Sequence, residues 1–358
     1  MKKFYVYLAD IHQDNIDIEK SILKDIAEVK QGKREEDEEK EKERVIKEAK
    51  TADAIGVRHT RITKEIIDQL ERCRIIARFG GGFDNIDVSA ATEKGIIVTF
   101  VPDYCTEAVA EHTLTFALVK IRGLKQFEDR VKKGFWSAQG VATEMAQDVT
   151  LGIIGLGRIG SALSRKASCI GFNVIAYDPF IHDEDFRINK AKKMTKLDDL
   201  LKSADIISLS VPLTRGEESK YPTFRMLGRE EFQKMKDGAY LINTCRGEVI
   251  NTEALISALK SGKISGLATD VIEGEPVQNS YLRKEDNPTF DRLRKMPNVT
   301  ITPHCAFAST RTVITVKEKG ALEIKRVLEG GFPRDIAWVN PEVKPKYLER
   351  LGTWSKVP

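Results

Sequence analysis

A chain of 358 residues exceeds the size of one ordinary hydrophobic core, so its length predicts two domains. Its 58 basic and 54 acidic residues leave a net charge of only +4, which argues against a nucleic-acid partner. No apolar run reaches the roughly 20 residues of a membrane span, and five cysteines without a CxxC pair argue against disulfides and a zinc site. We expect a cytoplasmic globular protein that binds no metal, nucleic acid or membrane.

Short apolar strands and helical patterns alternate over the first hundred residues, which is typical of a parallel sheet with helices on its faces. The charged run 33–50 combines Glu-to-Lys pairs with Val45, Ile46 and Ala49, which favours a solvated helix with one apolar side. The strand-like stretches are FYVYLA (4–9), ADAIGVR (52–58), CRIIARFG (73–80) and GIIVTFV (95–101).

A long helical region follows Pro102 and continues to about Gly134. Strands and helices then alternate strictly, and a last helix, about 310–328, leads into a proline-containing tail. Because this C-terminal segment has left the second sheet, we predict that it returns to the first domain and that the second domain is inserted into the first. The strands of the second domain are expected in TLGIIGL (150–156), NVIAYD (173–178), DIISLSVP (205–212), AYLINTC (239–245), SGLATDV (265–271) and VTITPH (299–304).

The first strand of the second domain runs into a glycine-rich turn with the sequence LGIIGLGRIG. Gly155 allows a tight turn, Gly157 admits a pyrophosphate close to the backbone, and Gly160 lets the helix pack on the strand. Arg158 and Ile159 begin that helix, whose N–H groups and positive end attract a phosphate. This pattern predicts a dinucleotide-binding loop, although the motif alone is a weak signal.

Asp178 strengthens the interpretation as a nucleotide site. It follows the strand NVIAY and lies 18 residues after Gly160, about where an acidic side chain accepts hydrogen bonds from an adenosine ribose. A carboxylate at this point repels a 2′-phosphate, so we expect NAD (NADH) rather than NADP. The alternative is an aspartate that only caps a helix or shapes a turn.

Residues with catalytic chemistry follow the later strands: Arg246 after AYLINTC, Asp270 and Glu275 after SGLAT, and His304 after VTITP. Because parallel sheets bind ligands at the carboxyl ends of their strands, we expect these side chains on the edge that the glycine loop occupies. Arginine grips a carboxylate, histidine exchanges a proton near neutral pH, and a neighbouring glutamate stabilises the imidazolium. With a nicotinamide, this set would transfer a hydride between a 2-oxo acid and a 2-hydroxy acid. Each residue alone could instead be a surface charge or a structural group.

These motifs resemble those of the D-isomer-specific 2-hydroxyacid dehydrogenase family, and the resemblance covers nearly the whole chain. It implies two Rossmann-like doubly wound domains, with an NAD-binding domain (102–305) inserted into a flavodoxin-like substrate domain (1–101 and 306–358). It rests on GGGFDNIDVSAATEKGI (80–96), VPDYCTEAVAEHTL (101–114), TLGIIGLGRIGSALSRKASCIGFNVIAYDP (150–179), NTCRGEVINTEALISALKSGKISGLATDVIEGEP (243–276) and PNVTITPHCAF (297–307).

The resemblance also implies roles for the matching residues. Arg246 would bind the substrate carboxylate and polarise the substrate carbonyl. Glu275 would pair with His304, the general acid for reduction and the general base for oxidation, and Asp270 would face the nicotinamide carboxamide.

Further contacts are implied by the same resemblance. Gly81 and Gly82 would offer backbone N–H groups to the substrate carboxylate. Pro212 would lie along the cofactor, while Thr244 and Cys245 would pass close to the nicotinamide. The helical region after Pro102 belongs to the family's dimer interface, so we expect a homodimer.

The choice of substrate depends on fewer residues. Phe307 matches an aromatic residue that D-lactate dehydrogenases and the C-terminal-binding-protein corepressors of this family place at the substrate side chain, with ordinary core packing as the alternative. Arg58 aligns with an arginine of phosphoglycerate dehydrogenases, and with Arg61 it could bind a phosphate; both could equally be solvated loop charges. Two stretches, 214–232 and 277–296, are longer than the family's usual loops.

We therefore expect an NAD-dependent D-2-hydroxyacid dehydrogenase that reduces a small 2-oxo acid. One alternative is D-3-phosphoglycerate dehydrogenase, which the lack of a C-terminal extension with the strand pattern of a regulatory domain makes less favoured. An alternative of another class is an NAD(H)-sensing, corepressor-like interaction protein, because the C-terminal-binding-protein corepressors of this family retain the same catalytic residues.

Overall fold

The computed structural model describes residues 3–10, 15–35, 37–216, 219–275 and 287–354. Its contacts divide the chain into two compact units, Met1–Cys105 with Ser309–Pro358, and Thr106–Ala308. These boundaries lie within four residues of those expected from the sequence. Among the described residues, no helix combines the length and the apolar character needed to cross a bilayer.

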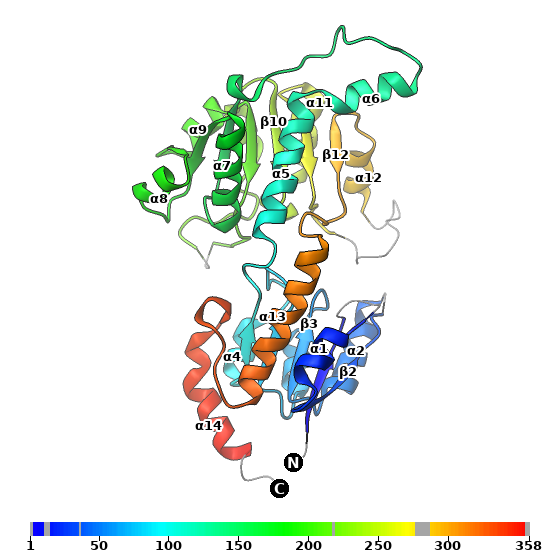
Figure 1. The fold of residues 1–358 in the computed structure, drawn as a ribbon, viewed down its shortest axis with the longest axis vertical. Helices are drawn as coiled ribbons and strands as arrows, with labels where there is room; N and C mark the ends of the chain where they lie inside the picture. The colour runs from blue at the N-terminus through cyan, green and yellow to red at the C-terminus, as the bar shows by residue number, and fades with distance from the viewer. Residues whose placement is uncertain (1–2, 11–14, 36, 217–218, 276–286, 355–358) are drawn as a thin grey trace. The chain divides into compact units, whose positions relative to one another are not determined.

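The first unit contains one parallel sheet, to which β2 and β3 in Figure 1 belong, and its five strands have the order β2-β1-β3-β4-β5. This is the order of flavodoxin-like doubly wound folds, as predicted. Its strands are β1 (Phe4–Leu8), β2 (Ala27–Gln31), β3 (Ala54–Val57), β4 (Ile75–Arg78) and β5 (Ile97–Thr99). Its helices are α1 (Asp17–Leu23), α2 (Glu38–Ala49), α3 (Lys64–Gln69), α4 (Val88–Glu93), α13 (Thr310–Leu328) and α14 (Lys344–Trp354).

Helices cover both faces of this sheet. Val6 and Leu8 of β1 belong to a core shared with α1, α13 and α14, whereas Tyr7 between them belongs to a core shared with α2, α3 and α4. Alternate residues of a strand therefore face opposite cores. The predicted charged helix is confirmed as α2, with Val45 and Ala49 buried.

The C-terminal segment belongs to the first unit. Helix α13 contacts α1, β3 and β4, and a Cβ on its Gly320 would lie 2.6 Å from the ring of Phe79. Beyond the helix, buried Asn340 accepts the N–H of Val98 at 2.8 Å and donates to the carbonyl of Ile96 at 3.0 Å. Its amide thus satisfies backbone groups at the edge strand β5.

The second unit contains a parallel sheet, to which β10 and β12 in Figure 1 belong, and its seven strands have the order β12-β11-β10-β9-β6-β7-β8. The chain passes from β6 to β7 on one side and later to β9 on the other, which is the doubly wound topology. Its strands are β6 (Thr150–Ile154), β7 (Asn173–Tyr177), β8 (Lys192–Lys193), β9 (Ile206–Leu209), β10 (Ala239–Asn243), β11 (Ile264–Thr269) and β12 (Val299–Ile301). Its helices are α5 (Thr106–Ile121), α6 (Leu124–Lys132), α7 (Arg158–Ile170), α8 (Asp183–Ile188), α9 (Leu197–Ser203), α10 (Arg229–Lys234), α11 (Thr252–Ser261) and α12 (Pro288–Arg294).

Two apolar clusters fill this unit, one on each face of its sheet. Helices α9, α10, α11 and α12 contribute to the first cluster, and α5, α7 and α8 to the second. Strands covered on both faces read as continuous apolar runs rather than alternating ones. This is why the sequence marked the central strands of the second unit so clearly.

The helical region after Pro102 is two helices rather than one. Helix α5 ends at Ile121, and Gly123 then adopts a positive φ of 57°, which interrupts the helix before α6 begins. The predicted helical region therefore consists of two helices with a break at Gly123. No residue of α6 is buried, and α6 and the segment after it extend away from their own sheet (Figure 1). Leu124, Val131, Phe135, Trp136 and Met145 are exposed along this arm, residues 124–145.

Candidate active site

The sequence-predicted residues of the second unit follow the carboxyl ends of its strands. The glycine loop follows β6, Asp178 follows β7, Arg246 follows β10, Asp270 follows β11, and His304 follows β12. Because β10, β11 and β12 are neighbours in a parallel sheet, the last three residues meet at one edge of the sheet. The glycine loop lies on the same edge, at the point where the strand order reverses.

The three glycines of the loop differ in what a side chain at each position would meet. Gly155 has a φ of +90°, and a Cβ there would lie 2.5 Å from the carbonyl oxygen of Ser210. A Cβ on Gly160 would lie 2.1 Å from the carbonyl oxygen of Gly155, so only glycine lets α7 pack this closely. A Cβ on Gly157 would meet nothing within 4 Å.

The open space at Gly157 lies where α7 begins. Gly157 is the N-terminal cap of the helix, no side chain caps it, and Arg158 and Ile159 form the first turn. A helix end of this kind presents backbone N–H groups and partial positive charge. The glycine loop therefore fits the pyrophosphate of a dinucleotide.

Asp178 links the glycine loop to the turn after β7. Its Oδ2 accepts the N–H of Leu156 at 2.8 Å, and its Oδ1 accepts the N–H of Phe180 at 2.9 Å. A carboxylate has about four lone-pair positions, so two backbone bonds leave capacity for ribose hydroxyls. Asp178 is thus both a turn-forming residue, the alternative weighed from the sequence, and a suitable ribose ligand.

His304 and Glu275 form a direct pair. The Nδ1 atom of His304 lies 2.6 Å from Oε2 of Glu275, and the two side chains are 36% and 30% exposed. The other carboxylate oxygen of Glu275 accepts the N–H of Ile272 at 3.2 Å. Because the glutamate is held at both oxygens, it fixes the orientation of the imidazole ring through Nδ1.

The backbone of His304 is strained, with a φ of +49° that side-chain-bearing residues rarely adopt. Its N–H donates to the carbonyl oxygen of Asp270 at 2.8 Å. The carboxylate of Asp270 is buried and accepts the N–H groups of Cys305 at 2.9 Å and Ala306 at 2.8 Å, together with the hydroxyl of Thr302. Asp270 therefore holds the turn 302–306 that carries the histidine.

This network continues to His112 on α5, which the sequence analysis did not single out. Its Nε2 lies 3.1 Å from the hydroxyl oxygen of Thr302, and its ring packs edge-to-face on Phe116. Ligand atoms of His112, Asp270 and Cys305 lie within 4.8 Å of one another, a set that could hold a metal ion. Because the carboxylate of Asp270 already accepts three hydrogen bonds from the turn, we interpret the cluster as a support for that turn.

Arg246 lies on a turn that Asn243 organises. The buried amide of Asn243 donates to the carbonyl of Arg246 at 2.9 Å and accepts the N–H of Cys245 at 3.0 Å, while the guanidinium Nη1 donates to the carbonyl of Cys245 at 2.8 Å. A Cβ on Gly247 would lie 2.0 Å from the backbone of Ile272, so glycine brings this turn against the one that carries Glu275. Asn243 and Gly247 were missed, although the stretch NTCRG contains both.

Thr244 and Cys245 occupy the same turn. The hydroxyl of Thr244 lies 2.8 Å from that of Thr113 on α5. Burial raises the pKa of the Cys245 thiol, so this cysteine stays protonated at neutral pH. The predicted neighbour Pro212 is exposed, and its carbonyl accepts the hydroxyl of Thr223 at 2.6 Å.

The predicted substrate-binding residues lie in both units. Gly81 and Gly82 form part of the bend after β4, with Gly81 exposed and Gly82 partly buried. Arg58, at the end of β3, is buried, and this burial lowers the pKa of its guanidinium, whereas Arg61 is exposed. The ring of Phe307, in the second unit, has its centroid 6.4 Å from that of His304.

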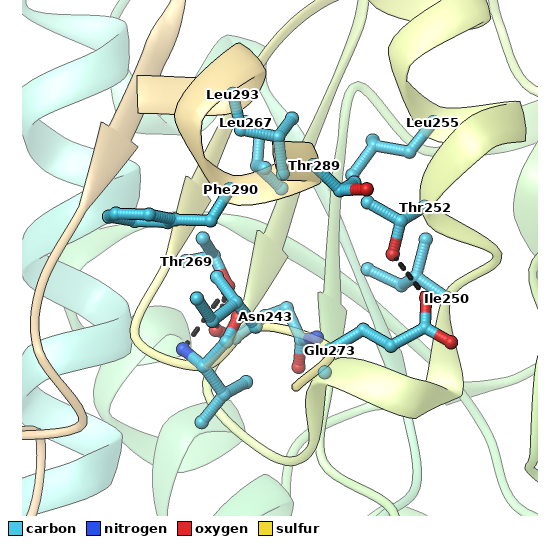
Figure 2. A pocket seen from close by; sticks show the side chains of 13 residues that line it. Asn243, Ile250, Thr252, Leu255, Leu267, Thr269, Glu273, Thr289, Phe290 and Leu293 are labelled. Atoms are coloured by element: carbon cyan, nitrogen blue, oxygen red, sulfur yellow. Dashed lines mark hydrogen bonds between the residues drawn. The ribbon is translucent and has the colours of Figure 1, made fainter. Parts of the chain in front are cut away.

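A pocket of about 340 Å³, partly open to solvent, lies beside these turns between α11 and α12 (Figure 2). Leu255, Leu267 and Leu293 line its apolar part, and Thr252 donates to Glu273 at 2.7 Å in its polar part. None of the sequence-predicted site residues lines this pocket. Asn243, Gly247 and Ile272, which shape the turns of Arg246 and Glu275, also line this pocket.

The two long loops differ in what the structure describes. The stretch 214–232 is described except for residues 217–218 and ends in α10. Of the stretch 277–296, residues 277–286 lie outside the described residues, and α12 accounts for most of the rest.

Comparison with known proteins identifies relatives. Residues 114–306 match the family model for the NAD binding domain of D-isomer specific 2-hydroxyacid dehydrogenases. A D-3-phosphoglycerate dehydrogenase of Methanocaldococcus jannaschii is 37% identical over 87% of this chain and 56% of the relative. A glyoxylate reductase of Korarchaeum cryptofilum is 36% identical over 84% of this chain and 86% of the relative.

Among solved structures, a D-lactate dehydrogenase from Aquifex aeolicus complexed with NAD and lactic acid has a TM-score of 0.78 and 32% identity over 91% of this chain and 96% of that chain. The chain spans about half the length of the phosphoglycerate dehydrogenases that it matches. These findings confirm the predicted fold, and the matched domain model agrees with NAD as the predicted nucleotide.

Proposed function

Because the chain belongs to the D-isomer specific 2-hydroxyacid dehydrogenase family, we propose that it is an NAD-dependent oxidoreductase that interconverts a small 2-oxo acid and its D-2-hydroxy acid. The observation that carries this proposal is the 2.6 Å pair of His304 and Glu275 beside the turn of Arg246, on the sheet edge that also holds the glycine loop. This arrangement combines a proton donor, a guanidinium that can bind a carboxylate, and a glycine loop that can bind the pyrophosphate of a dinucleotide.

Each side chain has one chemical task in the proposed reduction. Arg246 binds the substrate carboxylate through its planar guanidinium and donates to the adjacent carbonyl oxygen, which makes the carbonyl carbon more electrophilic. NADH, when bound, supplies the hydride that this carbon accepts. His304 then delivers a proton from Nε2 to the developing alkoxide, and Glu275 stabilises the imidazolium from the Nδ1 side before that transfer.

The groups that hold NAD and substrate are proposed on the same basis. Gly157, with the first turn of α7, would bind the pyrophosphate, and Asp178 would bind the adenosine ribose. Backbone N–H groups of Gly81 and Gly82 would bind the substrate carboxylate, and Phe307 would contact the substrate side chain.

An unphosphorylated substrate is the better-supported choice. Arg58 is buried and Arg61 is exposed, so the two do not share one environment as a phosphate-binding pair would.

A homodimer is part of the proposal. The arm, residues 124–145, exposes Phe135 (58%) and Trp136 (89%). Large aromatic side chains in solvent are typical of surfaces that bind another protein. The arm thus supports the interface expected from the family resemblance.

The function is tested by incubating the purified protein with NADH and a panel of 2-oxo acids. Glyoxylate, pyruvate, hydroxypyruvate, branched 2-oxo acids and 3-phosphohydroxypyruvate are compared, with loss of NADH absorbance as the readout. We expect turnover of at least one unphosphorylated acid. NADH binding without turnover of any of them would remove the enzymatic proposal and favour an NAD(H)-sensing role.

A further inference from the structure

The long loop after β9 has no role in the proposal above. Its base is closed by two threonines: the N–H of Thr214 donates to Oγ1 of Thr223 at 2.8 Å, and the N–H of Thr223 donates to the carbonyl of Thr214 at 3.1 Å. Oγ1 of Thr223 also donates to the carbonyl of Pro212 at 2.6 Å. The contacts of Thr214 and Thr223 therefore fix the base of this loop at the carboxyl end of β9.

Tyr221, two residues before Thr223 in this loop, contacts with its ring the ring of Phe180, which follows β7. The two ring centroids are 5.5 Å apart, and the ring planes are inclined at 84°. Phe180 is 67% exposed and Tyr221 is 41% exposed, so the pair stands largely in solvent. Two rings at right angles form a corner in which a flat ring can stack on one face and meet the edge of the other.

Phe180 is held next to the residue proposed to bind the adenosine ribose. Its N–H donates to Oδ1 of Asp178 at 2.9 Å, and the same carboxylate accepts the N–H of Leu156 from the glycine loop. The ring of Phe180 contacts that of Tyr221, so the loop after β9 reaches the turn that follows β7.

The strand order indicates which part of the dinucleotide should lie between the loops after β7 and β9. Strands β7 and β9 flank β6 in the sheet, and in a doubly wound fold a dinucleotide lies across the carboxyl ends of these strands. With the pyrophosphate at the glycine loop and the ribose at Asp178, the adenine comes next, at the turn after β7. That turn is where Phe180 and Tyr221 meet.

We propose that Phe180 and Tyr221 form an aromatic corner for the adenine ring of NAD(H), and that the long loop exists in this chain to bring Tyr221 to it. The proposal rests on the NAD-dependent function proposed above. The corner contributes affinity for the adenosine half of the dinucleotide and takes no part in the reaction at the nicotinamide. Stacking on an aromatic side chain does not depend on hydrogen-bond donors, which suits a purine whose edge remains in solvent.

The test measures binding rather than turnover. Dissociation constants of NADH, ADP-ribose and reduced nicotinamide mononucleotide are determined for the full-length wild type and for Tyr221→Ala and Phe180→Ala. We expect both variants to bind NADH and ADP-ribose about 5- to 30-fold more weakly, in line with alanine replacement of a base-stacking ring. Binding of the mononucleotide, which lacks the adenosine, should not change.

Two control variants accompany this measurement. Tyr221→Phe keeps the ring and should bind NADH as the wild type does. Ile188→Ala removes a side chain of α8 that is 59% exposed in the same unit and should also have no effect. Thermal unfolding of all variants checks that the fold is intact.

Three results would overturn the proposal. Unchanged or tighter NADH binding by Tyr221→Ala would mean that the rings do not hold the adenine or that they block its place. Equal losses for NADH and the mononucleotide would mean a general disturbance of the site. A wild type that binds none of the three probes would remove the proposed function itself, and this inference with it.

Discussion

The N–H of His304 lies 2.8 Å from the carbonyl oxygen of Asp270, whose buried carboxylate accepts the N–H groups of the next two residues, Cys305 and Ala306. One residue at the end of β11 thus fixes the turn after β12 through three consecutive backbone groups. The relation makes Asp270 a positioning residue for the imidazole, in addition to the nicotinamide contact that the family resemblance implies.

Asp270→Asn is therefore expected to impair turnover through geometry. The amide nitrogen cannot accept a hydrogen bond, so at least one of the N–H groups in the turn loses its partner. We expect kcat to fall by about 10- to 100-fold, as small misplacements of catalytic groups do, and the free energy of unfolding to fall by about 1–3 kcal/mol. Steady-state kinetics and urea unfolding measure the two effects. An unchanged kcat with an intact fold would contradict the positioning role.

His304→Ala is expected to separate chemistry from nucleotide binding. Removing the imidazole eliminates proton transfer, so kcat should fall by about 10²- to 10⁴-fold, while the dissociation constant of NADH should change little. Stopped-flow kinetics and equilibrium binding give the two numbers. Glu275→Gln is the companion variant and should lower kcat less, because the histidine remains. A parallel loss of NADH affinity in His304→Ala would mean that the residue holds the nucleotide.

Gly320 and Gly352 provide a matched pair of helical glycines. Alanine normally stabilises a helix relative to glycine by about 0.5–1 kcal/mol, and a Cβ on Gly352 would meet nothing within 4 Å. A Cβ on Gly320 would lie 2.6 Å from the ring of Phe79, so Gly320→Ala should instead destabilise by about 1–3 kcal/mol. Urea unfolding of both variants is the measurement. Stabilisation by both would mean that α13 does not pack as closely on the first sheet as described.

Glu19 gives a pH-dependent prediction. It is fully buried in α1, its oxygens have no hydrogen-bond partner on another described residue, and burial raises its pKa, against the opposing charge of Lys317. A carboxyl whose folded-state pKa is raised lowers stability once the pH exceeds its ordinary value of about 4.5, because the unfolded chain ionises first. Glu19→Gln should therefore stabilise the protein by about 1 kcal/mol at pH 7 and have almost no effect below about pH 4. Urea unfolding at the two pH values tests this, and an equal effect at both would contradict it.

A substitution in the exposed arm tests the proposed homodimer. Replacing Trp136 with aspartate places a charge on the apolar patch and should convert the proposed dimer into a monomer. Light scattering during size-exclusion chromatography measures the mass directly. Ile170→Asp, at the exposed C-terminal residue of α7, is the control and should leave the mass unchanged. A wild type that is already monomeric would contradict the proposed dimer.

Much of the fold could be predicted because its signals are local. Apolar runs marked the central strands, and the spacing of Gly155, Gly157 and Gly160 marked the loop between β6 and α7. Strand β2 (AEVKQ) was missed because an edge strand pairs on one side only and carries mostly polar residues. The break at Gly123 was missed because one glycine inside an apolar periodicity does not by itself end a helix.

The candidate site divides in the same way. Arg246, Glu275 and His304 could be proposed because each follows a recognisable strand and has a side chain with one obvious chemistry. Asn243, Thr302 and His112 could not, since they act on the backbone or on each other, and their partners are set by the packing of strands far apart in sequence. Of these three residues, only Asn243 had a local signal, because an asparagine at the end of a buried strand often shapes the turn that follows.

The positive φ of His304 places the imidazole proposed for proton transfer at a position where glycine would make the fold more stable. An L-residue at this φ costs about 1–2 kcal/mol compared with glycine, so glycine is the substitution that would relax the turn most and would also delete the imidazole. Selection for thermal resistance alone would thus favour an inactive protein at this position, which makes residue 304 a poor target for consensus or stability-guided engineering.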